Sequence, residues 1–287
     1  MKLAQLRTNE EVRSEPVTRS SSWRSNAASA VFQIWRPAAL LVGCLGIWWL
    51  ISAAHLVKAY LVPSPAATAE VLTRQWPYLS HNAWVTLYET LIGFAVAVVV
   101  GVAAAVLMVY SRNVEAALYP LLLFAQVVPK IAVAPLFVVW LGFGLTPKIL
   151  IAVLIAFFPV VISAVTGLKS VDPEILDLAA TMGADTWKTF AKIRFPGSLP
   201  YLFSGLKVAV TLAVTGALVG EFVGANEGLG FVILQANGNL DTPTLFAGLL
   251  VLTAIGVVLF AAVELAERWA LPWHASRRGR GAAATTL

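Results

Sequence analysis

The chain is poor in cysteine, histidine and charge, and each shortage excludes a class of site. Cys44 is the only cysteine among 287 residues and lies inside an apolar run, so neither a disulfide framework nor a cysteine-based metal site can form. His55, His81 and His274 are scattered without metal-ligand spacing, which argues against metal-binding and proton-relay roles. No Walker A sequence occurs: GEFVGANEGLG (220–230) has suggestive glycines but no following lysine, so it cannot cradle a nucleotide by that mechanism. We therefore expect no cofactor.

Apolar residues are what the chain has in abundance, at 59% of the sequence. A helix of about 20 residues crosses the roughly 30 Å of bilayer hydrocarbon. Six runs are long enough, at about 38–57, 88–110, 117–142, 148–167, 205–222 and 244–263. A β-barrel would alternate apolar and polar residues, which AVAVVVGVAAAVLMVY (95–110) does not. The first run is too long, and starts too far along the chain, for a cleaved signal peptide. The sequence thus predicts an all-α polytopic membrane protein with six transmembrane helices.

The lysines and arginines are distributed unevenly between the two ends of these spans. One side holds Lys2, Arg7, Arg13, Arg19, Arg24, Arg36, Arg112, Lys169, Lys188, Lys192, Arg194, Arg268, Arg277, Arg278 and Arg280; the other holds Lys58, Arg74 and Lys148. The positive-inside rule then places both termini and the segment 177–196 in the cytoplasm. We expect a disordered basic cytoplasmic tail over 1–35, a transmembrane domain over 36–270 and a cytoplasmic C-terminal tail over 271–287.

The loop between the first two spans carries helix-start signals. Ser64 is placed as an N-cap and Pro65 as the first helical residue, so we expect a short interfacial helix, with Trp76 and Tyr78 at headgroup depth. Small residues also recur every fourth position at Gly93, Ala97, Gly101 and Ala105 and at Gly216, Gly220, Gly224 and Gly228. Such ridges allow close helix packing, either within one bundle or at a subunit or gating interface.

A polar island, DLAATMGADTWKTFAKIRFP (177–196), interrupts the apolar sequence. Asp172 is a natural N-cap for a first short helix, and Gly183 suits the left-handed residue that closes it. Asp185 can cap a second helix, with Trp187 on one face, until Pro196 forbids continuation. Because a bare loop would need neither caps nor a turn, we interpret the island as a docking site.

The island resembles the cytoplasmic loop signature of bacterial ABC importer permeases, E-A-A-x3-G-x9-I-x-L-P. The residues that carry the resemblance, or that lie within the loop, are Asp177, Ala179, Gly183, Asp185, Trp187, Lys188, Ile193 and Pro196. Three positions depart from the pattern: Asp177 stands for Glu, Leu178 for the first Ala and Phe195 for Leu. Further stretches, VPSPAATAEVL (62–72), LIGF (91–94), VPKIAVAPLFVVWLGFG (128–144) and GEFVGANEGLGFVI (220–233), resemble the nitrate, taurine and alkanesulfonate branch of these permeases.

The resemblance implies a MetI-like permease fold in a bacterial inner membrane, with a coupling-helix loop between the fourth and fifth helices. It implies three protein partners: a second copy of the permease, cytoplasmic ATP-binding subunits that hydrolyse ATP, and a periplasmic or lipid-anchored solute-binding protein. The chain itself would be a transport subunit and not an enzyme, and it would not bind nucleic acid. The expected solute is a small anion such as an alkanesulfonate, taurine or nitrate, with a pyrimidine thiamine precursor as an alternative.

Lys130 is the clearest ionisable residue within a span, and such residues are usually functional. The flanking Pro129 and Pro135 should break the helix there and free carbonyl groups. Lys130 either lines a translocation path for an anion or pairs structurally with those carbonyls. Glu89 and Glu221, nearer the outer ends of their spans, are expected to be structural or gating groups rather than substrate ligands, with Glu221 beside such a path. An ion-coupled secondary transporter, the alternative class, would need several charges at the span centres, which the sequence does not show.

Overall fold

The computed structural model describes residues 23–54, 57–58 and 60–272, and every regular element in this part of the chain is a helix. The helices are α1 (Trp23–Ala53), α2 (Pro65–Arg74), α3 (Trp76–Tyr110), α4 (Arg112–Val127), α5 (Lys130–Leu141), α6 (Leu145–Lys169), α7 (Pro173–Thr181), α8 (Thr186–Thr189), the π-helical turn η1 (Phe190–Arg194), α9 (Phe195–Gly224), α10 (Leu229–Gly238) and α11 (Thr242–Ala270). The prediction of an all-α membrane protein is confirmed.

Four helical segments are long and apolar enough to cross a membrane: α3, α6, the run Thr186–Gly224 and α11. The expected third span is not one straight helix, because α4 and α5 meet at a break and are bent by 97°. Pro129 causes the break, since its ring disfavours helical conformation at Val128 and it has no N–H to donate. Counted as one span, the bent pair raises the number to five. The expected first span falls in α1, whose described apolar part, Ala39–Ala53, is shorter than a span.

Two helices begin earlier than the sequence analysis expected. α1 begins at Trp23, inside the segment 1–35 that the sequence predicted to be disordered; residues 1–22, and the tail from 273 on, lie outside the described residues. α3 begins at Trp76, about three turns before the expected start at 88, so Trp76 and Tyr78 belong to its first turn. The predicted interfacial helix is confirmed as α2, where the Ser64 hydroxyl accepts the Ala67 N–H at 3.1 Å.

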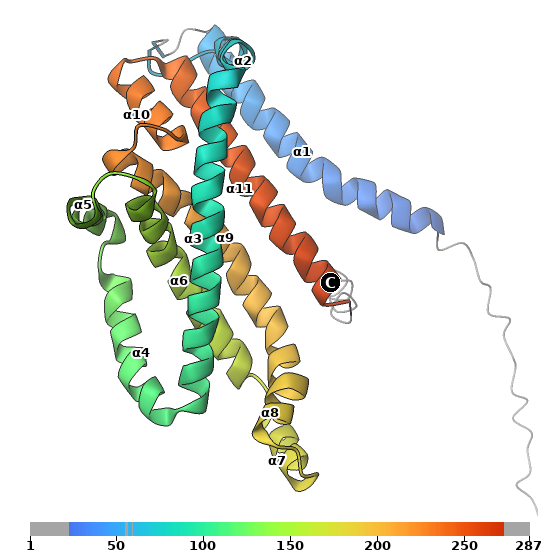
Figure 1. The fold of residues 1–287 in the computed structure, drawn as a ribbon. Helices are drawn as coiled ribbons and strands as arrows, with labels where there is room; N and C mark the ends of the chain where they lie inside the picture. The colour runs from blue at the N-terminus through green and yellow to red at the C-terminus, as the bar shows by residue number, and fades with distance from the viewer. Residues whose placement is uncertain (1–22, 55–56, 59, 273–287) are drawn as a thin grey trace, which may run out of the picture.

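The core of the bundle is formed by α3, α6 and α9, which lie side by side along its length (Figure 1). A Cβ on Gly93 of α3 would lie 2.6 Å from the Cβ of Ala152 in α6, and a Cβ on Gly216 of α9 would lie 2.6 Å from the Cα of the same alanine. The first ridge and the Gly216–Gly220 part of the second therefore serve close packing against α6 within one chain, whereas Gly224 packs on Phe143 and Gly228 on Glu221. In lipid such van der Waals contact is a main source of helix association, because the hydrophobic effect does not drive helices together there.

α1 lies at the edge of this bundle (Figure 1). Trp48 joins it to the rest: its ring stacks on Phe246 of α11 with centroids 5.7 Å apart, and its Nε1 donates to the Pro63 carbonyl at 2.9 Å. Cys44, on the same helix, is exposed.

Candidate functional site

The polar island forms the tip of the molecule at the end where α6 stops and α9 begins (Figure 1). The Asp172 carboxylate accepts the Glu174 N–H at 3.0 Å and starts α7 as predicted. Gly183 has φ +77°, the left-handed value expected for the residue that closes this helix, and the Ala184 N–H returns to the Ala179 carbonyl at 2.9 Å. The chain thus reverses within one turn, which a β-branched residue at 183 would resist.

The second half of the island also starts as predicted but does not end as predicted. The Asp185 carboxylate accepts the Lys188 N–H at 2.6 Å and caps α8. Pro196 does not stop this helix: it lies in the first turn of α9, and residues 186–224 form one helical run. The π-helical turn η1 explains the difference, because the Phe195 N–H bonds five residues back to Phe190 and the register shifts just before the proline.

The side chains of the island divide into an exposed surface and an anchoring face. Ala179 is buried, and Ile193 and Pro196 are partly buried. Asp177, Leu178, Gly183, Asp185 and Lys188 are exposed, and Trp187 is 72% exposed. Since Leu178 points outward, its replacement of the alanine in the loop pattern creates no packing conflict.

An aromatic cluster fixes α8 to the bundle. The Phe190 ring lies 5.8 Å from Tyr110 at the end of α3, 5.9 Å from Trp187 and 5.9 Å from Phe195, measured between centroids. Aromatic pairs at this spacing are favourable beyond their buried area. The exposed Trp187 is therefore held by a ring that contacts another helix.

Lys130 lies at the break between α4 and α5. Its Nζ donates to the Gln126 carbonyl at 2.9 Å and lies 4.9 Å from the centroid of the Phe158 ring. The structure therefore supports the second interpretation of this lysine, pairing with a carbonyl that the break leaves free. Pro135 does not interrupt the helix as the sequence predicted, because it lies inside α5.

A buried ion pair that the sequence analysis missed joins α3 to α6. The sequence analysis used Lys148 only to orient the spans, whereas its Nζ lies 2.7 Å from Glu89 Oε1, with 7% and 0% of the two side chains exposed. The available signal was Asn82, Thr86 and Glu89, whose spacing of four and three places three polar side chains on one face of an apolar helix.

That same face of α3 holds the start of α10. The Gly228 N–H donates to Asn82 Oδ1 at 2.7 Å, and the Leu229 N–H donates to the Thr86 hydroxyl at 2.8 Å. The Thr86 hydroxyl in turn donates to Glu221 Oε1 at 2.6 Å, and the other Glu221 oxygen accepts the Gly230 N–H. Glu221 is 1% exposed, so within one chain it lies in the packed interior and lines no open path.

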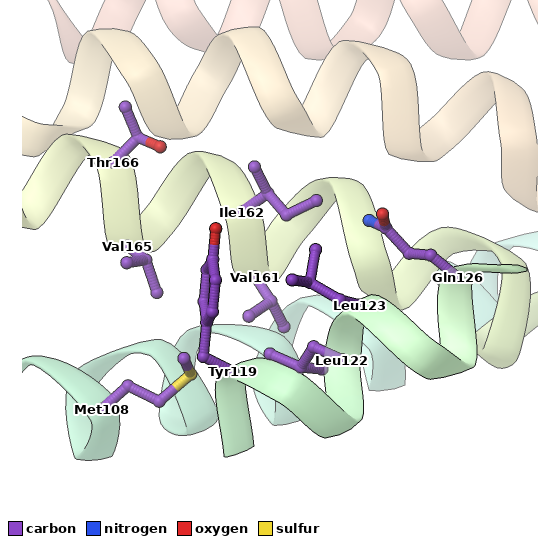
Figure 2. A pocket seen from close by; sticks show the side chains of 9 residues that line it. All are labelled: Met108, Tyr119, Leu122, Leu123, Gln126, Val161, Ile162, Val165 and Thr166. Carbon is purple, nitrogen blue, oxygen red and sulfur yellow. The ribbon is translucent and has the colours of Figure 1, made fainter. Parts of the chain in front are cut away.

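Two cavities lie between the helices, and only the first is close to these residues. One of about 260 Å³ adjoins the buried ion pair and is lined by Val85, Phe143, Gly144, Leu145, Lys148, Gly224, Ala225, Asn226 and Glu227. The other, of about 160 Å³, is mainly apolar and lies between α3, α4 and α6. Figure 2 shows Tyr119 extending from α4 toward α6 in this second cavity, with Gln126 and Thr166 as the other polar side chains of its lining.

The sequence of this region, from α3 to the end of α11, matches one known family. Residues 97–271 match the family model described as "Binding-protein-dependent transport system inner membrane component". The chain belongs to this permease family. Permeases of this family are not enzymes, and the ATPase activity of their transporters resides in separate subunits.

Curated relatives of this permease include the formylaminopyrimidine transport permease protein of Halalkalibacterium halodurans, 38% identical over 80% of this chain and 92% of the relative. Another is the taurine transport system permease protein of Escherichia coli, 29% identical over 83% of this chain and 91% of the relative. The fold is similar to a chain in inward-facing structures of the MetNI methionine ABC transporter, with a TM-score of 0.61, 19% identity, and coverage of 68% of this chain and 97% of that one. The MetI-like fold is thereby confirmed.

Proposed function

We propose that this permease is the membrane subunit of an ATP-driven importer for a small polar solute and that α7, α8 and η1 dock on its ATPase subunits. The observation that carries the proposal is the α7–α8 tip. It is a doubly capped turn that presents an exposed tryptophan, and large aromatic side chains are typical anchors of protein interfaces.

Each residue of this docking loop, formed by α7, α8 and η1, has a proposed role that follows from its position. Gly183 sets the angle between α7 and α8, Asp185 begins α8, and Trp187 fills a pocket on the partner. Lys188 and Asp177, both exposed, contribute charge at the rim, where it guides association more than it adds affinity. The partly buried Ile193 and Pro196 join the loop to α9.

A second copy of the chain is the proposed partner for α4 and α5. Both limbs of the bent pair carry large exposed apolar side chains, among them Phe124, Val127, Val139 and Trp140. Lipid can cover these side chains but cannot satisfy polar backbone groups at the break, whereas a protein neighbour can. A solute-binding protein would dock at the opposite end from α7, and both termini, with the 1–35 and 271–287 tails, would lie in the cytoplasm.

For the solute, a compound of the pyrimidine class is the first candidate. Lys148 and Lys207 form ion pairs with Glu89 and Glu267, so the charges of these two lysines are balanced within the chain, whereas Lys130 donates to the neutral Gln126 carbonyl. The formylaminopyrimidine permease also shares more sequence with this chain than the taurine permease does. Taurine and related sulfonates are the second candidate, supported by the taurine relative.

Co-purification tests the docking proposal. The tagged chain is solubilised from its native membranes as wild type, Gly183→Val, Trp187→Ala and Trp269→Ala. Trp269 is a matched control because it is an equally exposed tryptophan, 80%, in the last turn of α11. We expect a Walker-motif ATPase to co-purify with wild type and Trp269→Ala and to be depleted in the other two.

The same ATPase recovered equally with all four chains would refute docking through this loop, and recovery with none would refute the importer assignment. The solute is then tested on the solute-binding protein that is recovered with the transporter. Binding of formylaminopyrimidine and not taurine supports the first candidate, and the reverse supports the second.

A further inference from the structure

We propose that Glu221, held by Asn82, Thr86 and the start of α10, is a positioning residue that carries movement of the docking loop to the α9–α10 turn at the opposite end of the molecule. The inference rests on the proposed function, since it assumes that an ATPase moves α8. It concerns the turn 225–228, which forms one wall of the 260 Å³ cavity.

Glu221 is the anion bound at the N-terminus of α10. The first N–H groups of a helix have no partner within it and carry partial positive charge, so they bind anions. Here the N–H groups of Gly228, Leu229 and Gly230 are accepted in turn by Asn82, Thr86 and Glu221. The site that a ligand would occupy in another protein is filled by a side chain of α9.

The turn cannot move away from Glu221 without cost. Gly228 has φ +111°, and a Cβ there would lie 2.2 Å from Glu221 Oε1, so the backbone rests directly on the carboxylate. Separation from Glu221 would leave the buried carboxylate and the Gly230 N–H without each other, which is strongly unfavourable, while the Gly228 and Leu229 N–H groups would keep their partners on α3. Because the Thr86 hydroxyl of α3 also donates to Glu221, the carboxylate ties the turn and this part of α3 to α9, so the three shift together when α9 moves.

α9 in turn is continuous with the docking loop. The helical run Thr186–Gly224 has 39 residues, or a length of about 58 Å at the α-helical rise, and Figure 1 shows it reaching from the α7–α8 tip to the end of the bundle where α10 lies. Such a run transmits displacement at one end to the other. We therefore expect the docking loop, α9 with Glu221, and the turn to move together.

The experiment measures the accessibility of the turn in the purified transporter with its co-purified ATPase. In a Cys44→Ser chain, Asn226→Cys places a single cysteine on the exposed turn. Its labelling rate with a charged maleimide is measured without nucleotide and after trapping with Mg-ATP and orthovanadate. The comparison is repeated with Glu221→Gln, whose amide cannot accept both hydrogen bonds, and with Glu70→Gln, a control on the exposed α2 surface.

We expect a trapping-dependent change in labelling rate in the parent and in Glu70→Gln, and its loss in Glu221→Gln. Thr86→Val, which removes the hydroxyl between Leu229 and Glu221, should also lose it and serves if Glu221→Gln does not accumulate. The inference is overturned if trapping leaves the labelling rate of the parent unchanged, or if the change in labelling rate is retained in both Glu221→Gln and Thr86→Val. Either result leaves the importer assignment intact. Failure of any ATPase to co-purify overturns both.

Discussion

Replacing Lys148 by methionine should destabilise the permease far more than its position near the end of a span suggests. The substitution keeps an unbranched side chain that is one atom shorter, but it leaves the Glu89 carboxylate buried without its cation, 2.7 Å from where the ammonium was. Removing one partner of a buried ion pair typically costs about 3–5 kcal/mol. At about 2–4 °C per kcal/mol for a chain of this size, the melting temperature should fall by roughly 6–20 °C.

Thermal unfolding of the detergent-solubilised protein, followed by tryptophan fluorescence, checks this value. The control is Arg74→Met, which breaks an exposed pair with Glu70 of 2.9 Å and should cost less than about 1 kcal/mol. The double variant Lys148→Met/Glu89→Leu removes both charges and should recover much of the loss, because apolar replacement of a whole buried pair is often nearly neutral. A Lys148→Met loss no larger than that of Arg74→Met, or a double variant at the sum of its singles, would refute the reasoning.

Three further predictions concern single positions. Gly183→Val should reduce ATPase recovery more than Gly183→Asn in the pull-down, because asparagine tolerates φ +77° and valine does not; equal recovery would contradict the turn's role. Gly228→Ala should lower the yield of folded protein in size-exclusion chromatography, whereas Gly238→Ala, where a Cβ meets nothing within 4 Å, should match wild type; the reverse order would be inconsistent with the packing on Glu221. Trp187→Ala should weaken ATPase recovery while leaving the melting temperature within about 2 °C, since a mostly exposed side chain contributes little to stability, and a large drop would show that the tryptophan is structural.

Local chemistry could be predicted from the sequence wherever a cap or turn has a fixed requirement. Ser64, Asp172 and Asp185 accept the N–H groups that their positions as N-caps demand, and Gly183 has the positive φ expected of a closing glycine. These interactions join residues close in the chain, so the sequence contains all the information needed.

Pairings between distant segments could not be predicted in this way. Lys148 and Glu89 are 59 positions apart, and only the packing of α3 on α6 brings them together. Glu221 was recognised as a structural or gating candidate, but its partners at the start of α10 depend on the return of the chain after α9. The prediction that Pro196 ends the helix was wrong for a different reason. A π-helical turn in the preceding residues shifts the hydrogen bonding, so the helix continues through the proline.

The bend between α4 and α5 has a consequence for the membrane itself. α4 has 16 residues, so it is about 24 Å long, whereas bilayer hydrocarbon is about 30 Å thick. α5 turns away by 97° and adds little depth, while the neighbouring α3, with 35 residues, exceeds the full thickness. A segment that is too short for the bilayer is accommodated by local thinning or by association with a protein neighbour, such as the second copy proposed above. The transport rate should therefore depend on the acyl-chain length of the surrounding lipids. Membrane thickness would then influence transport in addition to ATP and solute.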